Sequence, residues 1–197
     1  ISLYALGRVD EIYNRLRFEG KVNGSDIRIA AFSAFIFDIT KKATDFNFCP
    51  NPIDFIEIAN LSSYVTDTPI FAAKLIEELN RVDTVWEPAG GATRGGYHSL
   101  PGKNIFEFES EKISQLTAII IDQIQTYFKI YKNEPCSFIK NFPTEINLVG
   151  WHVIFKKQGH QAAHIHPSGW LSGVIYLKVV ESRGLNEGAI EFGLNGE

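Results

Sequence analysis

The chain has 197 residues, of which 45% are hydrophobic and 21% are charged, and its formal net charge is -4. This composition is that of a globular protein long enough to form one substantial core. There is no block of Lys or Arg, which argues against nucleic acid as a partner. There is also no apolar run of the roughly 20 residues that a membrane helix needs. The two cysteines, Cys49 and Cys136, follow no metal or disulfide spacing, so we expect a reducing compartment and a cytoplasmic location.

The start of the chain is predicted to form two helices. Apolar residues recur at helical spacing over residues 2–18. Ser25 or Asp26 can cap a second helix that runs to about Lys42 and is apolar almost all round, so we expect it to pack on more than one side. Two helices of this size resemble the last unit of a tetratricopeptide array. We therefore treat residues 1–47 as a helical segment, with a protein partner as a further expectation.

Two more helices are predicted in the middle of the chain. Pro69 suits the first position of a helix that runs to about Val82. Ser110 is the predicted cap of a long helix over residues 111–131. Between them, residues 86–96 are rich in glycine and are predicted to form a loop. This loop lacks the Lys-Ser/Thr ending of a phosphate-binding loop.

The hydrophobic period changes to two from Glu145 onward. This alternation predicts a strand within residues 146–155 and further strands at 171–180 and 189–194. Helices therefore come first and short strands second. That order is typical of an α+β fold, in which a sandwich or barrel packs against helices on one side.

Three of the five histidines, His160, His164 and His166, lie within seven residues. On an extended backbone, residues two apart point to the same face, whereas on a helix they point to opposite sides. Pro167 and Gly169 follow at once and disfavour a helix. The spacing therefore predicts that His164 and His166 hold one metal ion. The alternative is that the two rings only form hydrogen bonds within a turn.

Several segments resemble the Fe(II)/2-oxoglutarate-dependent oxygenase superfamily, in particular those oxygenases whose catalytic domain sometimes follows tetratricopeptide repeats. The segments are His164-Ile165-His166, residues 171–177, residues 188–192 and, less specifically, residues 86–96. The resemblance covers roughly residues 48–197 and implies a double-stranded β-helix, which is a jelly-roll barrel packed on helices. The chain contains no methionine and stops before the last strands of such a barrel, so we expect a fragment with a truncated barrel. Its missing start leaves open whether a signal peptide precedes it.

The resemblance implies that Fe(II) and 2-oxoglutarate bind to this domain. His164 matches the first metal ligand of the superfamily, while His166 stands where a carboxylate is usual. Three outcomes follow: His166 binds the metal, it supports another ligand, or the site is degenerate. We favour ligation. The distal His and the Arg that binds 2-oxoglutarate in the superfamily would lie beyond residue 197.

The remaining site residues are assigned by position. Tyr176 and Lys178 share a face of the strand after the histidines and are candidates for binding 2-oxoglutarate, although Lys178 also suits a solvated strand end. Further candidates for contact with the substrate or with the metal ligands are His160, Gln161, Arg94 and Trp170, each with a surface or core role as its alternative.

The expected activity is hydroxylation of an unknown substrate, either a small molecule or a protein, with decarboxylation of 2-oxoglutarate to succinate. One alternative is a cupin-like metalloprotein of another reaction class. Cupins also contain His-x-His but expect a Glu shortly afterwards, and residues 167–171 supply none. The other alternative is a non-catalytic interaction module, in which the helices bind a partner and the barrel is a relic.

Overall fold

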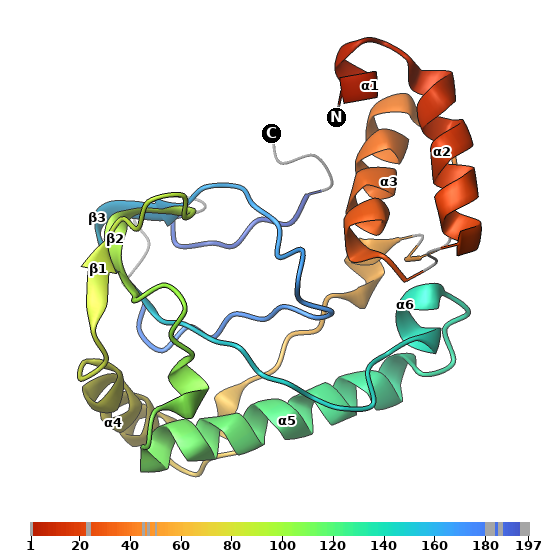
Figure 1. Ribbon diagram of the computed structural model, residues 1–197. Helices are drawn as coiled ribbons and strands as arrows, with labels where there is room; N and C mark the ends of the chain where they lie inside the picture. The colour runs from red at the N-terminus through yellow and green to blue at the C-terminus, as the bar shows by residue number, and fades with distance from the viewer. Residues whose placement is uncertain are drawn as a thin grey trace.

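The computed structural model describes residues 2–22, 25–44, 46, 48–49, 51–179, 184 and 187–193. The helices are α1 (Ser2–Ala5), α2 (Val9–Val22), α3 (Ile27–Thr40), α4 (Thr68–Leu79), α5 (Glu111–Tyr131) and α6 (Ser137–Lys140), with 3-10 turns at Pro52–Phe55, Leu61–Ser63 and Ile105–Glu107. The strands are β1 (Thr84–Trp86), β2 (Thr93–Ser99) and β3 (Val153–Gln161). Helix α5 lies along one side of the molecule, with α4 and the sheet near its start and α6 near its end (Figure 1).

Helices α2 and α3 lie side by side in opposite directions, as the sequence predicts (Figure 1). The predicted helix over residues 2–18 is divided, because Gly7 has a positive φ of 67° and separates α1 from α2. Asp26 caps α3, since its carboxylate accepts hydrogen bonds from the backbone N–H of Arg28 (2.9 Å) and Ile29 (3.2 Å). Whether this pair ends a tetratricopeptide array stays a prediction.

Helix α3 contacts two clusters of apolar side chains. Ile36 is buried against α2, and Ile29 also reaches the aromatic cluster around Phe48 and Phe138. Packing on more than one side is therefore present, but it does not surround the helix: Phe37 and Ile39 remain 41% exposed.

Helices α4 and α5 form the second layer and agree with the sequence prediction. The carboxylate of Asp67 caps α4 at the N–H of Ile70, and Pro69 occupies the first turn. Ser110 caps α5, because its hydroxyl accepts a hydrogen bond from the N–H of Ile113 at 3.1 Å. The two helices bury one cluster between them, made of Phe71, Leu75, Leu79, Ile105, Ile113 and Leu116.

The sheet is antiparallel and open, with the strand order β1-β2-β3. Its central strand, β2, lies largely where the sequence predicted a glycine-rich loop. The register between β2 and β3 slips between Arg94 and Gly96, where Gly95 has a positive φ of 61°. The backbones of Gly95 and Gly159 approach closely at this point, since a Cβ on Gly159 would lie 2.5 Å from the carbonyl oxygen of Gly95. The two glycines allow the strands to pair through the irregularity.

The mixed α+β class is confirmed, but the double-stranded β-helix is not. Strand β3 begins at Val153, later than predicted, and residues 171–179 and 189–193 form no strand. Residues 180 and 194, at the ends of those predicted strands, lie outside the described residues. Alternating hydrophobicity favours a strand, but a strand also needs a neighbouring strand that pairs with its N–H and C=O groups. Along 171–179 the structure instead packs Leu177 against the α4–α5 cluster.

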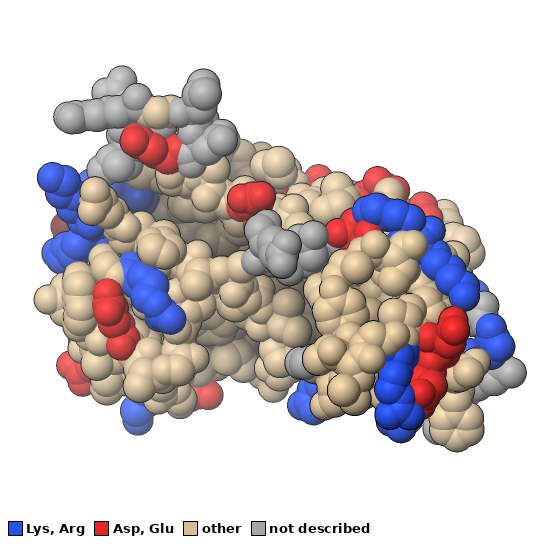
Figure 2. All heavy atoms as spheres, turned by 90° about the horizontal axis from the view of Figure 1, so that it is seen from above, with Lys and Arg blue, Asp and Glu red and all other residues tan. Residues whose placement is uncertain are grey.

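The surface has no strong bias in charge on the face that Figure 2 shows, where basic and acidic side chains are interspersed and most atoms are uncharged. Among the described residues, none of the helices combines the length and the apolar character that a bilayer crossing requires.

Candidate metal centre

The rings of His164 and His166 converge just beyond the end of β3. Their Nε2 atoms lie 2.9 Å apart, and their ring centroids lie 4.8 Å apart. The backbone is not part of a strand here, but the N–H of Ala162 donates to the carbonyl of Ala92 at 2.9 Å and continues the pairing of β2 with β3 by one step. The predicted convergence of the two imidazoles is therefore present, in a non-strand segment that leaves the sheet after Ala162.

The outer nitrogen of each ring has its own partner. Nδ1 of His164 donates to the carbonyl oxygen of Ala162 at 2.8 Å, and Nδ1 of His166 lies 2.9 Å from the hydroxyl of Ser172. The rings of Trp151 and His166 pack in a T-shaped arrangement with a centroid distance of 5.2 Å. Partners of this kind fix the orientation of metal-binding histidines in proteins.

The spacing of the two Nε2 atoms fits a metal ion. Two nitrogens each about 2.1 Å from one cation and at right angles to each other are about 3.0 Å apart. The observed 2.9 Å also fits a direct N–H···N hydrogen bond, so the pair suits either a shared proton or a cation. Burial, and secondly the neighbouring His164, lower the pKa of His166, which favours the neutral imidazole that binds metals.

The pair provides two ligands. In the described ranges, no group of three or more His, Cys, Asp or Glu side chains is placed to hold a metal ion. Carboxylate, water or co-substrate oxygens would have to fill the other positions, which suits a metal that takes mixed nitrogen and oxygen ligands.

Three other predicted site residues lie on the paired strands β2 and β3, outside the histidine pair. His160 and Gln161 are exposed at the end of β3, and His160 is paired with Arg94 across the strands. The guanidinium of Arg94 donates to the carbonyls of Gly91 (2.8 Å) and Thr93 (2.9 Å), so it stabilises its own loop.

Trp170 is partly buried and packs against the aromatic cluster of the core rather than beside the histidines. Its indole N–H donates to the carbonyl of Phe138 at 3.2 Å, and its ring packs on Phe138 and Phe48. This is the core role that the sequence left open as its alternative, and it anchors the chain just before Ser172.

Tyr176 and Lys178 are exposed, and between them Leu177 packs against the α4–α5 cluster. Within the portion of the chain that is described, no hydrogen bond or ion pair joins either residue to His164 or His166. The described structure therefore does not connect the two candidates to the pair.

Trp151 and Ser172 are the contacts that the sequence analysis did not assign. The two-residue alternation already placed Trp151 on one face of the β3 region, and Ser172 follows a Pro-Ser-Gly turn six residues after His166. Trp151 also stacks on His98, with ring centroids 5.9 Å apart. The Pro-Ser-Gly turn indicated that the chain could bring Ser172 back toward the histidines. Which histidine Ser172 contacts depends on the exact conformation of that turn.

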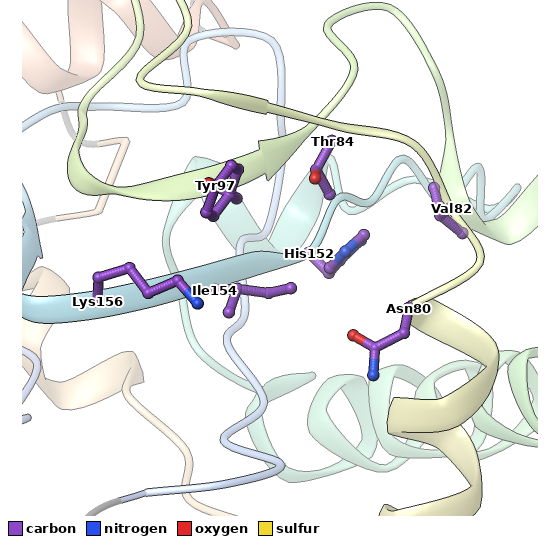
Figure 3. A pocket seen from close by; sticks show the side chains of 7 residues that line it. All are labelled: Asn80, Val82, Thr84, Tyr97, His152, Ile154 and Lys156. Atoms are coloured by element: carbon purple, nitrogen blue, oxygen red, sulfur yellow. The ribbon is translucent and has the colours of Figure 1, made fainter.

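A separate hollow lies on the other face of the sheet, toward the end of α4 (Figure 3). Its volume is about 240 Å³, and it is lined by Asn80, Val82, Thr84, Tyr97, His152, Ile154 and Lys156. Both ring nitrogens of His152 are buried and have no hydrogen-bond partner among the described residues. Burial first, and His98 second, lower the pKa of His152, so its ring is held neutral. Because side chains alternate along an extended chain, His152 faces away from Trp151 and the histidine pair.

Comparison with known proteins supports the same segment. Residues 150–193 match the model of the family described as "Putative 2OG-Fe(II) oxygenase". The match spans β3, both histidines and the segment that contains Ser172 and Lys178, and it confirms the resemblance found in the sequence. No curated protein and no solved structure matches the chain.

Proposed function

We propose that this chain is part of an Fe(II)/2-oxoglutarate-dependent dioxygenase, in which His164 and His166 hold the iron. The observation that carries the proposal is the convergence of the two Nε2 atoms, 2.9 Å apart, within the segment that matches the oxygenase family. The substrate is an unknown small molecule or protein.

Bound Fe(II) would supply the oxidising chemistry, in which 2-oxoglutarate is converted to succinate and a substrate is hydroxylated. The chain supplies orientation: the Ala162 carbonyl and the Ser172 hydroxyl hold the two rings, and Trp151 covers one side of His166. Lys178 and Tyr176 are the candidates for the co-substrate, because an ammonium group and a hydroxyl are suitable partners for a carboxylate.

The histidine at position 166 changes the charge of the proposed site. A carboxylate there would neutralise part of the charge of the metal, whereas a neutral imidazole leaves it intact. Two imidazole ligands therefore leave a more positive centre, which favours an anionic co-substrate such as 2-oxoglutarate.

The test is metal binding by the purified chain. We expect Fe(II), added without oxygen and followed by titration calorimetry, to bind with one site per chain. His164→Ala and His166→Ala should each weaken binding more than about 100-fold, since a ligand should matter more than the outer partners that cost 10–100-fold. The matched control is His160→Ala, which removes an exposed histidine outside the pair and should leave binding unchanged.

Succinate formation from 2-oxoglutarate is the second measurement. Metal binding that survives both substitutions in the pair would refute the proposed site. Metal binding without any turnover of 2-oxoglutarate, measured on a protein that carries this chain together with the distal His and Arg of the superfamily, would instead favour the cupin-like metalloprotein.

The interaction-module alternative is supported by the exposed apolar surface of the helical pair. Phe18 is 65% exposed, and Phe37 and Ile39 are each 41% exposed. Apolar side chains that stay exposed on these helices are available for contact with a protein partner. A chain that binds neither metal nor 2-oxoglutarate, but retains a protein partner through these helices, would favour this function.

A further inference from the structure

A continuous series of three hydrogen bonds runs through the histidine pair. The carbonyl of Ala162 lies 2.8 Å from Nδ1 of His164, the two Nε2 atoms lie 2.9 Å apart, and Nδ1 of His166 lies 2.9 Å from the Ser172 hydroxyl. One end of the series is a carbonyl, which only accepts, and the other end is a hydroxyl, which both donates and accepts.

The carbonyl determines where the protons lie when no metal is bound. Nδ1 of His164 must carry its hydrogen in order to donate to Ala162, so Nε2 of the neutral ring is a lone pair. The short contact between the rings is then a hydrogen bond in which Nε2–H of His166 donates. Nδ1 of a neutral His166 is left as an acceptor, and the hydroxyl of Ser172 donates to it.

A bound metal would require a different tautomer of His166 only. Both Nε2 atoms must then offer lone pairs, and His164 already does. The proton on Nε2 of His166 must leave and Nδ1 must take one up, so the ring remains neutral and no net proton is lost.

We propose that Ser172 is a positioning residue that accommodates both tautomers of His166, donating to Nδ1 when the site is empty and accepting from Nδ1–H when a metal is bound. A rotation of the hydroxyl hydrogen is enough to reverse the bond while the heavy atoms stay in place. A backbone carbonyl at this position would stabilise only the metal-bound tautomer, and a backbone N–H only the empty one. This inference rests on the proposed function, because it takes the pair to be the metal site.

Ser172 is a suitable target for substitution because its side chain is exposed and its removal should not disturb the core. Ser172→Ala removes the partner of Nδ1 in both states, so His166 should lose its fixed orientation. Ser172→Thr keeps the hydroxyl. Ser168→Ala is the matched control, since Ser168 is an exposed serine in the same turn and has no hydrogen bond to the pair among the described residues.

The first measurement is the nitrogen-15 NMR spectrum of the imidazoles in the full chain, with and without Zn(II). Zn(II) is used because it is diamagnetic and accepts histidine nitrogens. We expect His166 to carry its proton on Nε2 without metal and on Nδ1 with Zn(II), while His164 carries it on Nδ1 throughout. Finding the proton of His166 on Nδ1 already in the metal-free chain would overturn the inference.

The second measurement is Zn(II) affinity by calorimetry. Ser172→Ala should weaken binding roughly 10- to 100-fold, as expected for the loss of a partner of a ligand, and Ser172→Thr and Ser168→Ala should stay close to the wild type. Wild-type affinity in Ser172→Ala would overturn the role of Ser172. If His164→Ala abolishes Zn(II) binding, the proposed metal site stands even when the role of Ser172 fails. If His164→Ala binds Zn(II) normally, both the metal site and the role of Ser172 are refuted. Should Ser172→Ala not fold, the wild-type NMR spectra decide the question.

Discussion

Gly159 offers a sharp test of how the sheet positions the histidine pair. At this residue β3 lies close beside β2, and a Cβ placed on Gly159 would lie 2.5 Å from the carbonyl oxygen of Gly95 and 3.0 Å from the Cβ of Phe155. The closest atom belongs to the backbone, so a rotamer change cannot relieve the contact. Gly159→Ala must therefore move the two strands apart.

The size of the effect follows from the distances. Ordinary contacts of a Cβ begin at 3.4 Å, so the strands must separate by about 0.9 Å where Gly159 approaches Gly95. Overpacking of this kind typically costs about 1–3 kcal/mol, and we expect the free energy of unfolding to fall by about 2 kcal/mol. Because β3 ends at Gln161, shortly before His164, we also expect the affinity for Zn(II) to fall about tenfold.

The assay is urea unfolding followed by circular dichroism, combined with Zn(II) titration. Gly173→Ala is the control, because a Cβ there would meet nothing within 4 Å, and its free energy of unfolding should change by less than about 0.5 kcal/mol. If both variants unfold at the same urea concentration, the contact between β2 and β3 at Gly159 is not tight, and the predicted loss of stability is refuted.

Three further predictions concern stability. His152→Leu removes two buried ring nitrogens that have no partner among the described residues, and it should raise the free energy of unfolding by about 1–3 kcal/mol; a less stable variant would mean that the ring has a partner. Burial and His98 lower the pKa of folded His152, so the unfolded chain binds more protons, and the wild type should lose stability as the pH falls from about 6.5 toward that lowered pKa. This loss should be smaller in His152→Leu, and parallel pH curves from thermal unfolding would contradict the assignment. Leu75→Ala, at 0% exposure, should cost about 2–5 kcal/mol in urea unfolding, whereas Ile70→Ala, at 54% exposure on the same helix, should cost far less; equal costs would contradict the packing of α4. Ser110→Ala should lower the free energy of unfolding by about 1 kcal/mol through loss of the α5 cap, and an unchanged urea midpoint would argue against that cap.

The sequence by itself determined the features that depend on near neighbours along the chain. The cap Ser110 and the extent of α5 were predicted, and the cap of α3 was narrowed to Ser25 or Asp26, of which Asp26 is the cap. These features are local, because helix hydrogen bonds join residues four apart and the caps lie within the same turn. The convergence of His164 and His166 was also predicted from their spacing of two residues along the chain.

The tertiary structure decided everything that depends on partners far along the chain. Residues 93–99 form the central strand although they are rich in glycine, because β1 and β3 supply hydrogen bonds on both sides. Residues 171–179 have the alternation of a strand but gain no such partner. The burial of Trp170 against Phe138 and the contact of Ser172 with His166 are likewise absent from any local pattern. Strand pairing and side-chain contacts join residues across large separations, so only the folded chain determines which of them meet.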